Sequence, residues 1–205
     1  WVRPALCDEA LRLGRVLAGL LPTEAEVLGL LALMELQASR LRARTQADGT
    51  AILLEAQDRS RWDRLQIARG LQLLQRAQRL GGAAGAYVLQ AELAACHARA
   101  RRFEDTDWQR IVAVYDRLLQ VMPSPVVALN RAMAVAQANG AAAALPLVEA
   151  LQEARQLQAY APLHAVHGEL LQRLGRKDEA REAFARAVAL ATNLREREAL
   201  MARIQ

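Results

Sequence analysis

The chain has 205 residues and a formal net charge of +5, and 53% of its residues are hydrophobic although only 4% are aromatic. The hydrophobic excess is alanine and leucine, which favour helix interiors, so the composition predicts an all-α protein. No apolar run reaches the roughly 18 uncharged residues of a membrane span. The opening Trp1-Val2-Arg3-Pro4 lacks an initiator methionine and the apolar core of a signal peptide. We therefore expect a soluble, cytoplasmic fragment of a longer protein with no membrane contact.

Arginine supplies almost all of the positive charge, with Lys177 as the single lysine. A positive excess is common in nucleic-acid-binding proteins, but these arginines are spread along nearly every predicted helix among aspartate and glutamate. Such mixed charge is typical of a solvated surface, so direct DNA binding by this chain is not expected. Cys7 and Cys96 are too few for a disulfide framework and are predicted to be buried, reduced thiols of a cytosolic protein.

The first predicted helix extends to Pro22 and contains Asp8-Glu9-Ala10, the same tripeptide as Asp178-Glu179-Ala180 near the other end of the chain. The residues that follow stay in register, which predicts that this helix is the second member of a helical hairpin. Its partner helix is not in the sequence, so we expect an apolar face that another element covers.

The second predicted helix begins at a capping box, in which Thr23 caps the helix and Glu26 is its partner. Its apolar stripe is predicted to consist of Val27, Leu30, Leu31 and Met34. The helical pattern fades after Ser39.

Residues 41–61 interrupt the helical pattern. Asp48-Gly49 lies before Ile52-Leu53-Leu54, and an Asp-Gly pair between short extended runs favours a tight turn. Because an isolated hairpin is marginally stable in water, we expect this insertion to be an ordered loop that lies against the helices or a partner. The next helix is predicted to begin near Ser60 or Trp62 and to end at Gly81-Gly82, so residues 1–80 form a set of N-terminal helices with one insertion.

Residues 86–205 are predicted to form helical hairpins. Helices are expected over about 86–100, from a cap at Thr106 or Asp107 to Pro123, over 126–139 and 142–155, from near Pro162, and from about Leu194. The last hairpin has the spacing of a tetratricopeptide repeat (TPR). The repeat positions hold His164, His167, Gly168, Leu171, Ala180, Phe184 and Thr192.

Small residues at Gly168 and Ala180 allow the two helices of this hairpin to approach closely, and Phe184 is expected to fill the seam between hairpins. The histidines and Thr192 depart from the usual residue types of the repeat. We predict a single all-α domain over residues 1–205, a TPR-like α-solenoid of about ten helices in antiparallel pairs.

No arrangement of residues predicts an active site. His164, His167 and Glu169 share one helix, but metal-binding helices more often use a spacing of four and need a third ligand nearby, so we expect packed histidines. Cys96 and His97 are neighbours on a helix, where their side chains cannot face each other as a nucleophile and its base must. No Gly-rich phosphate loop, nucleophile elbow or zinc spacing occurs. We predict no enzyme activity, no cofactor and no metal.

Two polar segments that contain tryptophan, residues 57–63 and 104–108, are candidates for partner binding. Each places an acidic residue and a tryptophan at a helix start, so helix capping and packing would explain them structurally. Alternatively they form a partner groove, because arginine and tryptophan are enriched at binding hot spots. The candidate partner-binding residues are Asp58, Arg59, Arg61, Trp62, Asp63, Asp105, Asp107, Trp108, Asn130 and Arg131.

Four sets of residues occur in order along the chain: Leu6 to Ala10 with Leu21-Pro22, Gln57 to Asp63, Glu104 to Trp108, and Ser124 to Ala132. Together they closely resemble the C-terminal extension of a group of extracytoplasmic-function RNA polymerase sigma factors. The resemblance covers essentially the whole chain and implies a helical, TPR-like extension that follows two sigma domains, which bind core polymerase and the promoter. Those two domains are absent from this sequence, so the resemblance implies a regulatory interaction module.

The sequence thus favours a bacterial-type module that regulates transcription through contacts with its sigma domains, the polymerase core or a regulatory protein. Two alternatives stay open, which are DNA contact by the arginine-rich surface and small-molecule sensing on the concave side of the stack. A homodimer through the apolar N-terminal face also stays open. Under the first hypothesis, replacing Arg61 and Trp62 together with alanine is expected to abolish transcription and to leave most of the fold intact.

Overall fold

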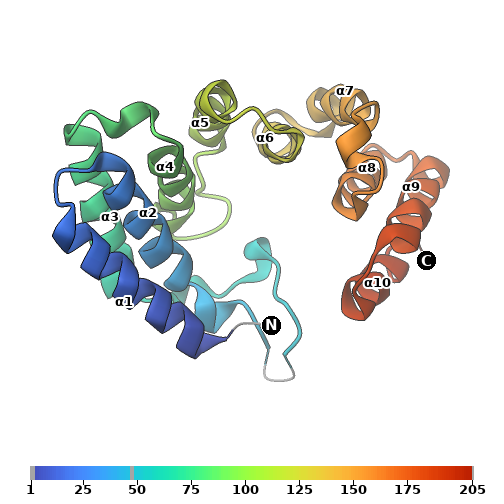
Figure 1. Cartoon of the computed structure of the whole chain (residues 1–205). Helices are drawn as coiled ribbons and strands as arrows, with labels where there is room; N and C mark the ends of the chain where they lie inside the picture. Colours follow the sequence, from blue (N-terminus) through green and yellow to red (C-terminus); the bar gives the residue numbers. More distant parts are fainter. Residues whose placement is uncertain (1–2, 47–48, 205) are drawn as a thin grey trace. The chain divides into compact units, whose positions relative to one another are not determined.

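In a computed structural model, which describes residues 3–46 and 49–204, the described chain contains ten α-helices, most of them joined by short loops and α2 and α3 by a longer segment with 3-10 turns (Figure 1). The helices are α1 (Pro4–Leu20), α2 (Ala25–Ala38), α3 (Arg64–Arg79), α4 (Ala86–Arg99), α5 (Trp108–Val121), α6 (Pro125–Asn139), α7 (Ala141–Gln152), α8 (Ala161–Arg173), α9 (Lys177–Leu190) and α10 (Leu194–Met201). Within the described ranges there is no β-strand, and no helix is both long and apolar enough to cross a bilayer. The predicted all-α class is confirmed.

The chain divides into two compact units, each described here by itself. The first comprises Trp1–Arg110 with Gln120–Met122, and the second comprises Ile111–Leu119 with Pro123–Gln205. In the first unit α2 packs against α1, α3 and α4, and α3 also packs against α4. In the second unit α6, α7, α8, α9 and α10 pack one on the next. Packing of helices on their neighbours in sequence is the solenoid-like arrangement that the sequence predicts.

Helix α2 lies at the centre of the first unit. A Cβ atom added at Gly29 would lie 2.6 Å from Val88 Cγ2, so only glycine allows α2 and α4 to approach this closely. The predicted apolar stripe of α2 is largely wrong, because three neighbouring helices bury a different set of side chains. The buried residues are Leu28, Gly29, Leu31, Ala32, Glu35 and Leu36, whereas Val27, Leu30 and Met34 are only half-buried.

The predicted capping box at the start of α2 is also wrong. Glu24, rather than Thr23, is the N-cap residue, and its side chain makes no capping hydrogen bond. Glu26 instead accepts hydrogen bonds from the backbone N–H groups of Tyr87 (3.0 Å) and Val88 (3.1 Å) in the first turn of α4. A carboxylate is favoured at a helix N-terminus because the first N–H groups lack partners within the helix. Glu26 therefore links two helices that are far apart in sequence.

The segment between α2 and α3, apart from residues 47–48, is a loop with three short 3-10 turns. Thr45 and Ala51 form an isolated antiparallel bridge. The backbone N–H of Ile52 donates to Arg44 O at 2.8 Å, and that of Gln46 donates to Thr50 O at 2.8 Å. These bonds close a tight turn around Gly49, whose φ is 82°. The other residue of the predicted turn pair, Asp48, lies outside the described residues.

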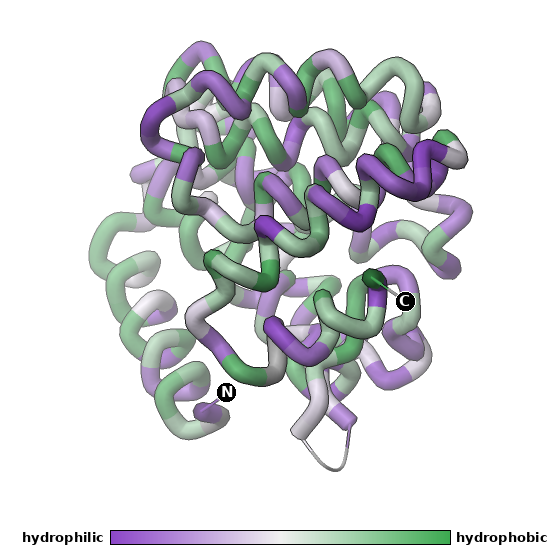
Figure 2. Tube along the Cα trace, turned by 90° about the vertical axis from the view of Figure 1, so that its right-hand side faces the viewer, coloured by the Kyte–Doolittle hydropathy of each residue, from purple (hydrophilic) through white to green (hydrophobic). Residues whose placement is uncertain are grey.

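Helix α1 leaves an apolar face uncovered within its unit. Leu11 is buried, and a Cβ atom added at Gly14 would lie 3.2 Å from Leu31 Cδ1, so Gly14 faces α2. In contrast, Leu6, Leu13 and Leu20 are 59%, 53% and 73% exposed. Figure 2 shows hydrophobic colouring along much of the helix that leads away from the N label. The predicted exposure of an apolar N-terminal face is confirmed, and its covering by another element stays a prediction.

In the second unit, the residues at the repeat spacing form the seam between α8 and α9. Leu171, Ala180, Phe184 and Ala187 are all buried. A Cβ atom added at Gly168 would lie 3.0 Å from the Phe184 ring, so the glycine permits the close approach that the sequence predicts. Phe184 thus packs against the partner helix of its own hairpin.

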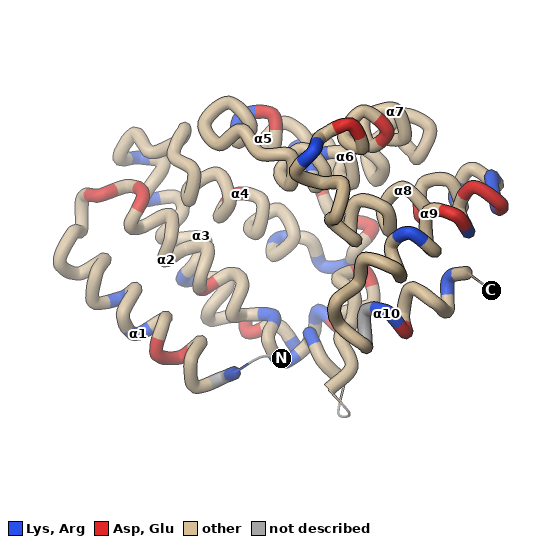
Figure 3. Tube along the Cα trace, turned by 45° about the vertical axis from the view of Figure 1, so that its right-hand side comes forward, with Lys and Arg blue, Asp and Glu red and all other residues tan. Residues whose placement is uncertain are grey.

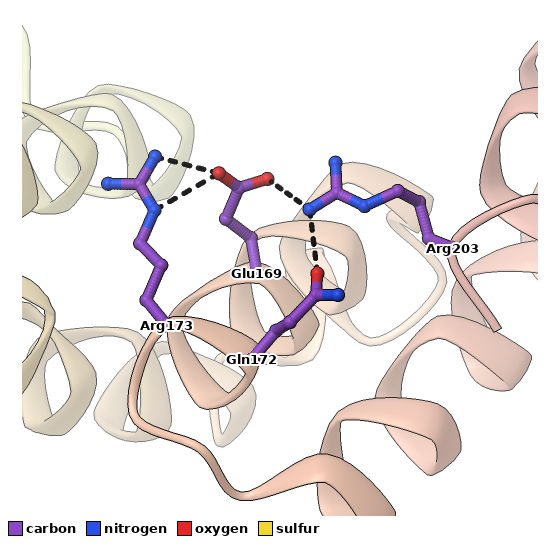
Figure 4. Close-up of polar contacts among 4 residues, drawn as sticks. All are labelled: Glu169, Gln172, Arg173 and Arg203. Atoms are coloured by element: carbon purple, nitrogen blue, oxygen red, sulfur yellow. Dashed lines mark hydrogen bonds and ion pairs between the residues drawn. The ribbon is translucent and has the colours of Figure 1, made fainter. Parts of the chain in front are cut away.

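A polar network ties the chain's last described turn to α8 (Figure 4). Glu169 accepts hydrogen bonds from Arg173 at 2.7 Å and from Arg203 at 3.1 Å, and Arg203 also donates to Gln172 Oε1 at 2.9 Å. The Arg203 guanidinium carbon lies 5.3 Å from the centre of the Phe184 ring. Arg203 therefore covers the end of the α8–α9 seam.

Candidate functional site

Arg59 brings the two tryptophan-containing segments together in the first unit. Its Nη1 donates to the backbone carbonyls of His97 (2.7 Å) and Ala100 (2.9 Å), and its Nη2 donates to Thr106 Oγ1 at 3.4 Å. The carbonyls at a helix C-terminus lack partners and carry a partial negative charge, so a buried cation is stabilised there. Arg59 thus fastens residues 57–63 and 104–108 to the end of α4.

The Trp62 ring lies beside this arginine, and a second pair of rings packs nearby at the end of α4. The Arg59 guanidinium carbon lies 4.9 Å from the centre of the Trp62 ring, and that of Arg40 lies 5.7 Å from it. His97 packs edge-on against Trp108, with ring centres 5.3 Å apart. We call Arg40, Arg59, Trp62, His97 and Trp108 the Trp–Arg cluster. Cation–π and edge-on ring contacts of this kind are favourable, and stronger when desolvated.

The Trp–Arg cluster is a buried, cation-rich environment. Burial and the nearby charges of Arg40 and Arg59 lower the pKa of His97 from 6.5 to about 4. Burial and the charges of Arg44 and Arg59 lower the pKa of Arg40 to about 10. His97 is therefore neutral at neutral pH, and its Nδ1 is buried without a hydrogen-bond partner among the described residues.

Three of the predicted acidic site residues cap helices. Asp63 Oδ1 accepts from the backbone N–H groups of Leu65 (2.9 Å) and Gln66 (3.0 Å) at the start of α3. Asp107 accepts from the Arg110 N–H at 2.9 Å in the first turn of α5. Asp58 accepts from the Ser60 N–H at 2.9 Å, which caps a short 3-10 turn. These carboxylates are held by the backbone, as the capping alternative predicts.

The Trp62 side chain is only 3% exposed and belongs to the core of its unit. Truncating it is expected to destabilise that unit, so the double replacement of Arg61 and Trp62 does not separate loss of function from loss of fold.

Arg61 is exposed. It lines a cavity of about 470 Å³ with Arg42, Ser60, Trp62 and Asp63. Arg61 is the predicted site residue that is best placed to meet a partner.

The remaining predicted site residues lie apart from this cavity. Asp105 is exposed and pairs with Arg102 at 3.0 Å. Asn130 and Arg131 lie on α6 in the second unit, where Arg131 pairs with Asp116 at 2.5 Å. The structure therefore brings together the first two polar segments but assigns Asn130 and Arg131 to a different unit.

A groove between α1, α2 and α3 was not predicted from the sequence. It has a volume of about 580 Å³, and we call it the α1–α3 groove. Its lining residues are Arg15, Leu31, Glu35, Arg69, Gln72, Leu73 and Arg76. Two sequence features could have indicated this groove. Arg69, Gln72 and Arg76 are spaced so that they lie on one face of α3, and a glutamate lies in the apolar face of α2.

The residues considered for metal binding or for nucleophilic catalysis do not form a site in the described part of the chain. His164 lies 3.2 Å from the carbonyl of Gln158, and His167 lies 3.9 Å from Glu149. No group of three metal-ligating side chains occurs in the described part of the chain. Burial raises the pKa of the Cys96 thiol, which disfavours the reactive thiolate.

Residues of both charge signs are scattered along the helices (Figure 3). Several arginines pair with acidic residues one turn away, including Arg12 with Glu9 (2.7 Å) and Arg181 with Asp178 (3.2 Å). The distribution agrees with the predicted solvated surface. Exposed pairs of this kind contribute little to stability.

Comparisons with known proteins found a family model that matches part of the chain and a longer relative. Residues 1–78 match a family of unknown function, DUF6596. The chain is 51% identical over 191 residues to an uncharacterized protein, R00370, of Rhizobium meliloti (strain 1021). The match covers 93% of this chain and 44% of that protein, so the chain spans less than half the length of the curated relative. The part that matches the family contains all residues that line the α1–α3 groove.

Proposed function

We propose that this chain is a cytoplasmic protein-interaction module of an extracytoplasmic-function RNA polymerase sigma factor. It modulates transcription initiation through contacts with the sigma domains, the polymerase core or a regulatory protein. The resemblance of four segments to the C-terminal extension of such factors supports this proposal. The length of the Rhizobium meliloti relative supports it too, because that protein has room for further domains.

The observation that carries the proposal is the Trp–Arg cluster. Two of the resembling segments meet at the end of α4, where Arg59 bonds both to the helix carbonyls and to Thr106. Next to this fixed core, the exposed Arg61 lines an open cavity. An arginine held beside a rigid aromatic core is a frequent binding hot spot. The module therefore offers a preformed surface at this cavity.

The test mixes the purified chain with separately expressed sigma domains and with core polymerase, and measures complex formation by calorimetry. Arg61→Glu is expected to weaken the complex about tenfold, because it reverses a charge without touching the core. Arg79→Glu, on an exposed residue of α3 outside this cavity, is the matched control and should bind like the unmodified chain. Absence of any complex, at low and at high salt, would contradict the proposal.

A further inference from the structure

We propose that the α1–α3 groove binds an acidic, extended peptide segment of a partner protein. The proposal rests on the interaction-module part of the proposed function and names a second contact site for it. The residues that carry it are Arg15, Glu35, Arg69 and Arg76 with the apolar Leu31 and Leu73.

The groove has an excess of positive charge. Three arginines and a single carboxylate line it. Arg15 donates through Nε (2.9 Å) and Nη2 (2.7 Å) to Glu35 Oε1, so one positive charge is matched. Arg76 donates to the carbonyl of Pro22 at 2.7 Å, which leaves its charge uncompensated. Arg69 is exposed and has no ion pair or hydrogen bond in the described part of the chain. An occupant with carboxylates complements this excess.

The floor of the groove needs a hydrogen-bond donor. Glu35 is only 1% exposed, and its Oε2 is buried without a partner among the described residues. Both donors of Arg15 go to the other oxygen. A buried acceptor without a donor is costly, and a peptide backbone supplies N–H groups. Arg15 is about half exposed, so its remaining guanidinium N–H groups can meet an incoming carboxylate while the Arg15–Glu35 pair stays formed.

The shape of the groove favours a peptide over a small molecule. It is an open groove along three helices rather than an enclosed cavity, whereas small-molecule sites bury most of the ligand surface. Leu31 and Leu73 form an apolar wall against which an aliphatic side chain of the segment packs. The expected segment therefore combines acidic residues with a leucine-like side chain.

The experiment selects short linear peptides from a random displayed library on the immobilised chain. Aspartate and glutamate are expected to be enriched in the selected peptides. The strongest peptide, labelled with fluorescein, is then titrated by fluorescence anisotropy. Arg69→Glu is expected to weaken its binding about tenfold, with a further loss when Arg76→Glu is added. Arg79→Glu, on the same helix but outside the groove, is the control and should not change the affinity.

Two further measurements sharpen the result. Raising the salt concentration from about 0.05 to about 0.5 M should weaken binding of the peptide, because its contacts with the exposed arginines are screened. Circular dichroism of each variant separates loss of binding from loss of fold.

Selection of neutral or basic peptides, or acidic peptides whose binding Arg69→Glu leaves unchanged, would overturn this inference. Self-association of the chain that Arg69→Glu abolishes would overturn it as well, because the groove would then be a contact between two copies. Failure of the sigma-domain complex together with selection of acidic peptides at the groove would contradict the proposed sigma-factor role alone.

Discussion

Helices α1 and α9 contain the same Asp-Glu-Ala tripeptide, but they differ in which faces they bury. In α9 the residues at the seam, Ala183, Phe184 and Ala187, are at most 4% exposed. The equivalent positions of α1 hold Leu13, Gly14 and Leu17, and the two leucines are 53% and 38% exposed. Equivalent residues of the same sequence pattern are therefore buried or exposed according to which helices pack around them.

The neighbours explain the difference. Helix α9 lies between α8 and α10, whereas the main contact of α1 within its unit is with α2. The side of α1 that faces α2 includes Gly14, where an added Cβ atom would lie 3.2 Å from Leu31 Cδ1, so Leu13 on the neighbouring side of the helix stays exposed. The open face of α1 therefore carries leucines of the kind that usually pack against another helix. For this reason an apolar partner is expected to cover that face.

The largest expected effect tests this contrast directly. Phe184→Ala should lower the free energy of unfolding of the second unit by about 3–5 kcal/mol, because it leaves a cavity at the α8–α9 seam. Leu17→Ala in α1 should change the stability of the first unit by less than about 1 kcal/mol, because the side chain is already exposed. Urea unfolding followed by circular dichroism measures both. Equal losses would mean that α1 is covered as α9 is.

The second prediction concerns acid stability at the covered end of α4. The pKa of His97 is lowered to about 4 in the folded chain, so below its ordinary value of 6.5 the unfolded chain binds a proton that the folded chain does not. Stability should therefore fall by about 3 kcal/mol as the pH decreases from about 6.5 to about 4. Unfolding at a series of pH values measures this.

His97→Gln is the control for the acid response. It removes the titrating ring, so the stability of the variant should change much less between those pH values. An unchanged pH dependence in the variant would show that another group causes the response.

The smallest expected effect compares two glycines. Gly168→Ala should cost about 1–3 kcal/mol, because the new methyl group meets the Phe184 ring at 3.0 Å. Gly19→Ala in α1 meets no atom within 4 Å and should be neutral or stabilising by up to about 1 kcal/mol. In a Phe184→Ala background the cost of Gly168→Ala should disappear, which a double-mutant cycle measures. A cost that persists there would place the strain elsewhere.

The helix boundaries and the α8–α9 seam were largely predictable, because repeat spacing and capping residues are local properties of the chain. The hydrogen-bond partners of Glu26 were not predictable. Its carboxylate accepts from the backbone N–H groups of Tyr87 and Val88, which lie far along the sequence. The buried face of α2 was mispredicted for the same reason. Periodicity gives one apolar stripe, but a helix surrounded by three others buries more than one face.

The candidate site was predictable only in part. The tryptophan segments were recognised as helix starts, and Asp63 and Asp107 do cap helices. The role of Arg59 as a link to the α4 carbonyls follows only from the folded chain. The α1–α3 groove combines Arg15, Glu35 and Arg69 from three helices, and no sequence spacing relates them.

By itself, the sequence determined that the chain is helical, approximately where its helices lie, and that its first helix carries an apolar face, because alanine–leucine periodicity and helix breakers act over one or two turns. Only the tertiary structure decided which faces are buried, that Arg59 is held beside the Trp62 ring at the end of α4, and that Glu35 has an unpartnered oxygen in a cationic groove. Those features depend on contacts between segments tens of residues apart, and burial and charge become definite only when the helices pack.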